Sequence, residues 1–232
     1  MAQFKLLSVI IPVFNEKNTV IKIIEKVRAV KLNGIRKEIL LVDDASTDGT
    51  TELLNKINFP NLKKFHHEKN RGKGAAIRTA IPHTKGDFIL IQDADLEYDP
   101  DDYSKILNPL VSGDADVVFG SRFLGPRRVF LFWHFVGNRL LTLITNVLYN
   151  TNLTDMETCY KVFQGDILRS IRLRSNRFNF EPEISAKILK KKYRIYEVPI
   201  TYKGRNFEEG KKITWRDGIV ALMVLFYYKF FD

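Results

Sequence analysis

Cysteine is nearly absent from this chain, and so are long apolar runs. Cys159 is the one cysteine among 232 residues, which excludes an internal disulfide framework and fits a reducing compartment. No uninterrupted apolar run approaches the roughly 20 residues that a membrane-spanning helix needs. Residues 1–7 also lack the apolar segment of a signal peptide. We therefore expect a cytoplasmic protein with one packed thiol.

Negative charge is scarce relative to positive charge. The chain has 37 Lys and Arg against 27 Asp and Glu, a formal net charge of +10. A basic surface attracts nucleic acid, anionic lipid or phosphorylated substrates, and composition alone does not choose among them. The basic residues are scattered and no aromatic stacking motif accompanies them, so a nucleic-acid partner is not expected.

Short apolar runs that end in polar residues alternate with helical patterns along most of the chain. We predict strands near 6–13, 38–42, 61–66, 88–91, 116–120 and 194–200, and helices near 20–27, 53–57, 73–80, 103–110, 140–149, 166–170, 184–190 and 219–228. This alternation indicates an α/β fold with a mostly parallel central sheet flanked by helices, and with C-terminal helical additions. Ligands of such sheets bind beyond the carboxyl ends of the strands. Glu16, Asp44, Asp93, Asp95 and Arg122 should converge there.

The run 88–91 leads directly into the carboxylates Asp93, Asp95 and Glu97. An extended backbone would place all three on one side, where they repel one another unless a cation lies between them. Hard cations such as Mg²⁺ or Mn²⁺ prefer oxygen ligands, and Mg²⁺ is typically shared between carboxylates and substrate phosphates. The alternative is a solvated acidic turn that follows a strand.

Gly72 and Gly74 open the predicted helix at 73–80. Two glycines at a helix start permit an anion to approach the backbone amides closely. The spacing of a P-loop is absent, so this is not a triphosphate cradle of that type. The alternative is a helix that packs tightly on the sheet.

The second half of the chain contains two apolar helices and a charged loop. The helix within 129–149 has an apolar face beside a polar stripe, which lines a cleft or faces water. The glycine-bounded loop 204–212 is a surface loop or a lid that brings Arg205 and Lys211 onto a phosphate. In the last helix we expect core or subunit contacts first, and membrane-interface contacts at its Tyr-Tyr-Lys-Phe-Phe end.

Several motifs together resemble the family 2 glycosyltransferases of GT-A fold, and within them the dolichyl/polyprenyl-phosphate mannose synthases. The motifs occur in the same order over nearly the whole chain. They are Val9 to Glu16, Val42 to Thr50, Asn70 to Gly74, Asp93-Ala94-Asp95, Gly120-Ser121-Arg122, Asp155 to Lys161, Phe180-Glu181-Pro182-Glu183, Glu197 to Ile200 and the loop Tyr202 to Lys212.

The resemblance implies roles for individual residues. The nucleotide sugar would be bound by Pro12, Phe14, Glu16, Val42, Asp44, Lys73, Asp93, Ala94 and Asp95. The metal ion would be bound by Asp93 and Asp95, with Glu97 as a possible third ligand. Catalysis would depend on Asp93, Asp95, Arg122, Arg205 and Lys211. The acceptor phosphate would be held by Arg122, Arg128, Asn138 and Arg139, with Arg127 nearby.

The resemblance also implies an activity. The expected reaction is metal-dependent, inverting transfer of a hexose, mannose or glucose, from GDP-mannose or UDP-glucose to a polyprenyl or dolichyl phosphate. Mg²⁺ or Mn²⁺ would be the cofactor, and the protein would be peripheral to the cytoplasmic face of a membrane, with a homodimer or a membrane-protein partner. A single domain is expected, with a nucleotide-sugar half at about 1–125 and an acceptor half at about 126–232.

The chain departs from the polyprenyl-phosphate mannose synthases in two features, and two alternative functions stay open. Glu97 stands where many polyprenyl-phosphate mannose synthases have Gln, which weakens the inference of the donor, and the multi-span tail of some relatives is missing. A family 2 glycosyltransferase acting on a saccharide or another non-lipid acceptor is the first alternative. A nucleotide- or nucleic-acid-binding module is the more distant one.

Overall fold

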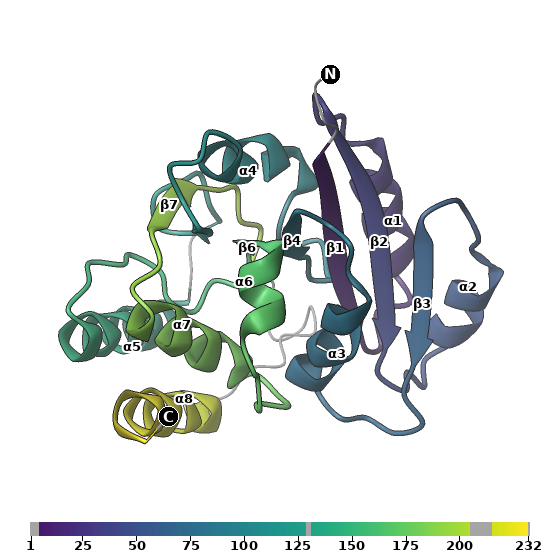
Figure 1. Cartoon of the computed structure of the whole chain (residues 1–232). Coiled ribbons are helices and arrows are strands. Elements are labelled where there is room, and N and C mark those ends of the chain that lie inside the picture. The colour runs from purple at the N-terminus through teal and green to yellow at the C-terminus, as the bar shows by residue number, and fades with distance from the viewer. Residues whose placement is uncertain (1–4, 129–130, 205–214, 232) are drawn as a thin grey trace.

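The centre of the molecule is a seven-stranded sheet with the strand order β3-β2-β1-β4-β6-β5-β7 (Figure 1). The computed structural model describes residues 5–128, 131–204 and 215–231. The strands are β1 (Lys5–Val13), β2 (Ile35–Asp43), β3 (Leu62–His66), β4 (Phe88–Ile91), β5 (Val117–Ser121), β6 (Lys161–Gln164) and β7 (Ile195–Pro199).

Eight α-helices lie in the described part of the chain. They are α1 (Val20–Ala29), α2 (Thr50–Lys56), α3 (Lys73–Ala80), α4 (Tyr103–Val111), α5 (Phe132–Tyr149), α6 (Gly165–Ser170), α7 (Phe180–Lys190) and α8 (Trp215–Phe230), with short 3₁₀ turns at η1 (Ile81–His83) and η2 (Pro100–Asp102). Every helix and strand predicted from the sequence is present, with shifted ends. The largest shift is at α5, which begins eight residues before the predicted range 140–149, and α7 and α8 each begin four residues earlier than predicted.

Strand β6 is the element that the sequence did not predict. It pairs antiparallel with both β4 and β5, whereas the other four strand pairings are parallel. Its four residues include the fully buried Lys161, whose ammonium donates to the carbonyl oxygens of Met156 and Thr158. A lysine in a run of four residues hides the apolar pattern of a buried strand.

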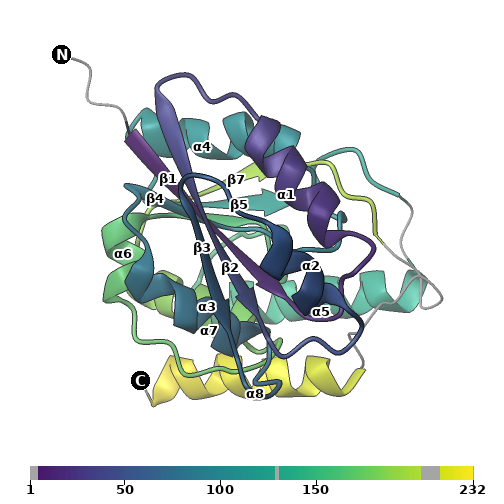
Figure 2. The same ribbon diagram turned by 90° about the vertical axis from the view of Figure 1, so that its right-hand side faces the viewer.

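The helices form layers around this sheet. Right-handed crossovers place α1 and α3 on opposite faces, and Figure 2 shows them on either side of the strands. The N-terminal end of the described chain lies at the opposite end of the molecule from α5, α7 and α8. These three helices lie at the side toward which β1 and β2 run (Figure 1).

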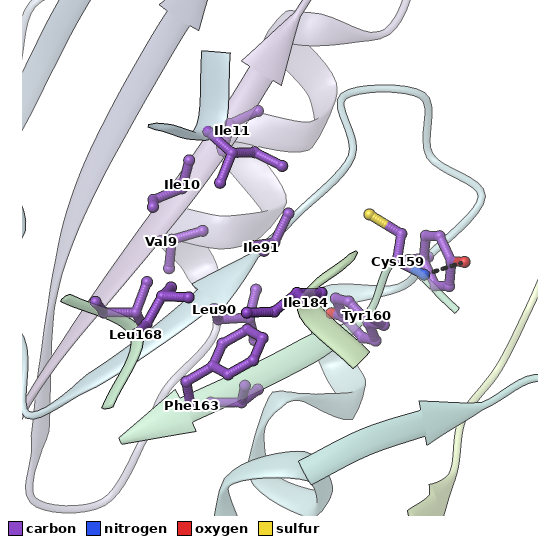
Figure 3. Close-up of a cluster of buried hydrophobic side chains, with 14 of the residues drawn as sticks. Val9, Ile10, Ile11, Leu90, Ile91, Cys159, Tyr160, Phe163, Leu168 and Ile184 are labelled. Carbon is purple, nitrogen blue, oxygen red and sulfur yellow. Dashed lines mark hydrogen bonds between the residues drawn. The ribbon is translucent and has the colours of Figure 1, made fainter. Parts of the chain in front are cut away.

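The core is formed where β1, β4 and β6 lie side by side. Val9, Ile10, Leu90 and Phe163 are fully buried there (Figure 3). Apolar runs with no polar alternation are typical of strands that are covered on both faces, which is the arrangement found. The buried Cys159 lies at the edge of this cluster, so its thiol is packed as expected.

Pro12 is tolerated in a central strand because the neighbouring strand has already ended. The amide of Gln92 donates to the carbonyl oxygen of Ile10, so the even-numbered residues of β1 face β4. The last β1–β4 pair is Ile10 with Ile91, two residues before Pro12. The missing N–H of the proline therefore removes no ladder hydrogen bond.

Helix α5 buries two threonines and exposes many of its apolar side chains, whereas an ordinary surface helix buries its apolar side. Its buried residues are Thr142 and Thr145, and the Thr142 hydroxyl accepts a hydrogen bond from the amide of Met156. Its exposed side carries Phe132, Trp133, Val136, Leu140, Leu143 and Val147. The polar stripe predicted from the sequence therefore packs inward. No helix in the described residues is long and apolar enough to cross a bilayer.

Candidate active site

The chain turns sharply after β4. Buried Gln92 accepts hydrogen bonds from the hydroxyls of Tyr103 and Tyr160, which fixes the exit of the strand. Residues 93–97 then form a turn, in which the Asp95 carboxylate accepts from the amide of Glu97 and the intervening residue has φ of 64°. The extended backbone predicted for the three acids is therefore wrong, and strand alternation does not align their carboxylates.

The Glu97 side chain has a hydrogen-bond partner of its own, Tyr202. Its Oε2 accepts a hydrogen bond of 2.7 Å from the hydroxyl of Tyr202. Among the described residues, no three His, Cys, Asp or Glu side chains converge on a metal-sized site. Asp93 and Asp95 remain, and two carboxylates with substrate phosphates are a sufficient ligand set for Mg²⁺. The donor set thus fits a divalent metal ion, while ligation by Glu97 stays a prediction.

Asp44 fixes the loop that leads into α3. Its carboxylate accepts from the amides of Arg71 and Gly72, at 2.8 and 2.7 Å, and contacts Nδ1 of His67 at 2.6 Å. The side chain is almost fully buried. Its role in the described structure is to position the helix start, and contact with a nucleotide stays a prediction.

The two glycines at this helix start are required by packing. A Cβ on Gly72 would lie 2.4 Å from the carbonyl oxygen of Asn176, and one on Gly74 would lie 2.5 Å from that of Ser175. Gly72 also has φ of 95°, which disfavours other residues. The tight-packing alternative therefore describes this motif, and it brings the loop 175–176 against the first turn of α3.

Lys73, at the first position of α3, is the centre of a buried charged cluster. Its ammonium lies 2.9 Å from Oδ1 of Asp93, 2.8 Å from Oε1 of Glu181 and 2.8 Å from Sγ of Cys159. Burial opposes its charge, but Asp93, Cys159 and Glu181 outweigh that cost and raise the pKa of Lys73. Three segments far apart in the sequence therefore meet at one cation.

Helix α7 supplies two carboxylates from its first turn. Glu181 binds Lys73, whereas Glu183 accepts from the amides of Arg174 and Ser175 and pairs with Lys187 at 2.8 Å. Glu183 thus holds the loop that packs on Gly74. The motif Phe180-Glu181-Pro182-Glu183 belongs to the site through both of its acids.

Glu157, a partly buried acid whose pKa is raised by burial, lies close enough to this cluster for Glu181 to raise that pKa further. Oε1 of Glu157 is shut off from solvent and has no hydrogen-bond partner among the described residues. Burial, with a further contribution from Glu181, raises the pKa of Glu157 to about 7. Burial lowers the pKa of the neighbouring Lys161.

Arg122 is held by a buried ion pair with Asp155. The guanidinium Nε and Nη2 each lie 2.7 Å from a carboxylate oxygen, and the Arg122 amide donates to the same carboxylate. Glu197 of β7 in turn accepts from the amides of Thr154 and Asp155. A phosphate contact by Arg122 would have to use its remaining donor groups.

Three arginines gather around Phe123. The guanidinium carbons of Arg127 and Arg139 each lie 5.5 Å from its ring centroid, and that of Arg122 lies 6.0 Å away. The ring also contacts Phe135 of α5 at a centroid distance of 5.6 Å. Phe123 therefore contacts both these three arginines and the first turn of α5.

The remaining predicted residues are distributed as follows. Pro12 and Val42 lie in paired strands, and Phe14 and the buried Glu16 follow β1. Ala94, which lies between the two aspartates in the sequence, is buried. Arg128 donates to the carbonyl of Gly204, and Asn138 donates to that of His134 within α5. Arg205 and Lys211 lie outside the described residues.

The amino-acid sequence that forms this site matches a known family. The sequence profile described as "Glycosyl transferase family 2" matches residues 8–172. The chain belongs to glycosyltransferase family 2. It is 34% identical over 205 residues to the low-salt glycan biosynthesis hexosyltransferase Agl6 of Haloferax volcanii, a match that covers 87% of this chain and 49% of that protein.

Two further relatives of this family 2 chain have names that mention lipid phosphates. Dodecaprenyl-phosphate galacturonate synthase of Rhizobium johnstonii is 28% identical, with 97% of this chain and 68% of the relative covered. UDP-N-acetylglucosamine–dolichyl-phosphate N-acetylglucosaminyltransferase of Methanococcus voltae is 28% identical, with 91% and 94% covered. This chain spans about half the length of Agl6 and nearly all of the Methanococcus protein.

Solved structures confirm the fold class. Glucosyl-3-phosphoglycerate synthase from Mycobacterium tuberculosis, crystallised with Mn²⁺, UDP and phosphoglyceric acid, superposes with a TM-score of 0.77 at 16% identity, covering 98% of this chain and 80% of that one. The family 2 chain therefore has the GT-A fold that was predicted from its motifs.

Glu181, Cys159 and Asp155 are contact residues that the sequence did not single out for the site. Glu181 and Cys159 meet Lys73 across more than 80 residues of chain, and no local pattern signals such a contact. The only available signal was that both residues occur in motifs of the resemblance.

Proposed function

We propose that the protein is a metal-dependent, inverting glycosyltransferase that moves a hexose from a nucleotide-diphospho-sugar to a polyprenyl phosphate. Family membership supports the transfer reaction, and the names of the two lipid-phosphate relatives support the acceptor. Those names mention galacturonate and N-acetylglucosamine, so the donors to be tested extend beyond GDP-mannose and UDP-glucose.

The observation that carries the lipid acceptor is the position of the arginines relative to α5. Arg122, Arg127 and Arg139 surround Phe123, which contacts Phe135 in α5. The helix then turns an apolar stripe outward over its whole length. A phosphate bound by the arginines would leave an isoprenoid chain free to lie along that stripe.

Helix α8, which packs against α5, also carries exposed apolar side chains. Its exposed side chains are Ile219, Val220, Met223, Phe226, Tyr227 and Phe230, followed by Phe231. Exposed apolar side chains gathered on two neighbouring helices are typical of an interaction surface. We assign the outward faces of α5 and α8 to the interface of a membrane that contains the acceptor, at its cytoplasmic side.

The described residues have defined tasks in this reaction. A divalent ion bound at Asp93 and Asp95 would stabilise the charge that develops on the departing diphosphate. A phosphomonoester acceptor is already anionic at neutral pH, since its second pKa is about 6. It attacks the anomeric carbon without a strong general base, and a single displacement inverts that carbon. Arg139 and its neighbours would position the acceptor phosphate.

A panel of nucleotide sugars with a short polyprenyl phosphate tests the proposal, with and without Mg²⁺ or Mn²⁺. Transfer that requires both metal and lipid phosphate, with an inverted anomeric centre by NMR, is the expected result. The panel should include UDP-N-acetylglucosamine, UDP-galacturonate, GDP-mannose and UDP-glucose. Transfer to 3-phosphoglycerate or to a saccharide alone would instead support the non-lipid alternative.

A further inference from the structure

We propose that Lys73 is the resident counter-ion of Asp93, and that a divalent metal ion binds there only as the Lys73 ammonium moves away from Asp93 while keeping its contacts with Glu181 and Cys159. This inference rests on the proposed metal-dependent function. It adds a competition between a side chain of the protein and the metal for one carboxylate.

The geometry places Lys73 in the position of a competitor. Its ammonium lies 2.9 Å from Oδ1 and 3.2 Å from Oδ2 of Asp93, so it spans both oxygens of the carboxylate. The two side chains are only 15% and 18% exposed. A metal ion that used both oxygens would overlap the ammonium, and a nearby +1 charge would repel a +2 ion strongly in a site with little water.

The same structure offers Lys73 a place to withdraw to. Oε1 of Glu181, a side chain that is only 5% exposed, lies 2.8 Å from the ammonium, and Sγ of Cys159 also lies at 2.8 Å. A small rotation of the lysine side chain would keep Glu181 compensated while Asp93 becomes available. Glu181 therefore makes the exchange possible. It remains as a counter-charge when the ammonium leaves Asp93, and a buried ammonium without a counter-charge would destabilise the protein strongly.

The position of Lys73 in the chain explains why this cation is held so firmly. It is the first residue of α3, and the loop before it is tied to Asp44 while the two flanking glycines pack on residues 175 and 176. The backbone that carries the lysine is thus fixed, and only the side chain is left to move. Metal binding and nucleotide binding should accordingly be linked through this one side chain, because a diphosphate offers Lys73 a further anionic partner.

Mn²⁺ binding to the substrate-free protein, measured from the loss of the free-ion EPR signal, tests the competition without any turnover. Lys73→Gln removes the charge but keeps a donor for Glu181 and Cys159, and we expect it to bind Mn²⁺ at least tenfold more tightly than the wild type. Lys73→Arg keeps the charge and should bind as weakly as the wild type. Lys69→Gln, at an exposed position nearby, is the matched control for the change in net charge.

Equal Mn²⁺ affinity in the wild type and Lys73→Gln would overturn the competition and leave the proposed function standing. No Mn²⁺ binding to either protein, with or without UDP or GDP, would overturn both. If Lys73→Gln does not fold, NMR of ¹⁵N-labelled lysine ammonium groups in the wild type replaces it. The Lys73 resonance should then shift on addition of Mg²⁺, and an unchanged resonance at saturation would contradict the exchange.

Discussion

Asp155 accepts two hydrogen bonds from the guanidinium group of Arg122, each 2.7 Å long, and its carboxylate is fully buried. A pair of the same form, between Asp116 and Arg194, lies at the surface. The molecule therefore contains the same kind of Arg–Asp ion pair once in its interior and once at its surface. The surface pair can serve as the control for the effect of burial.

Asp155→Asn should destabilise the protein by about 3–5 kcal/mol, because it leaves a buried guanidinium without its counter-charge. Asp116→Asn should cause a much smaller loss, since water screens the exposed pair. Urea unfolding followed by circular dichroism measures both. Equal losses would mean that the buried pair contributes no more than the surface pair.

Under the proposed mechanism, Asp93→Asn and Asp95→Asn should each lower metal-dependent transfer by about 100-fold or more, since each would remove one ligand of the ion that stabilises the leaving diphosphate. Both positions are partly exposed, so the fold should be retained. Initial rates at saturating Mn²⁺ give the measurement. Asp101→Asn, an exposed acid in the following 3₁₀ turn, is the control. Near-normal rates in both variants would refute the metal role.

Trp133→Ser in α5 and Met223→Ser in α8 should each weaken binding to liposomes by about tenfold, because each removes an apolar side chain from the proposed membrane-binding surface. These side chains are 79% and 58% exposed, so stability should hardly change. Flotation with vesicles that contain anionic lipid measures the bound fraction. Val111→Ser in α4, also at an exposed apolar position, should leave binding unchanged. Loss of binding in that control would indicate nonspecific adhesion.

Glu157 should make the protein less stable as pH rises from about 4.5 to about 7. Burial raises its pKa from 4.5 to about 7, so the folded state holds a proton that the unfolded state has lost across this window. Glu157→Gln should therefore gain about 1–3 kcal/mol relative to the wild type at pH 8 and little at pH 4.5. Urea unfolding at both pH values tests this, with the exposed Glu68→Gln as control. A gain of equal size at both pH values would contradict the assignment.

The sequence predicted most of the fold because most elements have an unambiguous pattern. The continuous apolar runs of β1 and β2 and the helical spacing of α1 identify elements without tertiary information. Strand β6 escaped because it is short and carries Lys161, whose buried ammonium is satisfied by carbonyl groups from the preceding loop. Only the folded structure supplies those carbonyls.

The candidate site was predicted less completely than the fold. Asp93, Asp95 and the basic residues near Phe123 were named because polar residues follow strand ends or form motifs. The bonding of Lys73 was not predictable, since Asp93, Cys159 and Glu181 reach it from separate segments. The turn at 93–97 was also missed, because Leu96 adopts φ of 64°, a conformation that its residue type does not signal.

Strand β6 is antiparallel to β4 and β5. The residues that lie at the carboxyl ends of β4 and β5 are therefore those that precede β6, and not those that follow it. The segment 150–160 thereby joins the helix α5 to Lys73, and it carries Asp155, Glu157 and Cys159 on the way. Exchange of this segment between relatives would therefore alter the surroundings of Arg122 and of Lys73 together, while β4 and α3 stay in place. The reversed strand thus makes one short segment the common neighbour of Arg122 and Lys73, through Asp155 and Cys159.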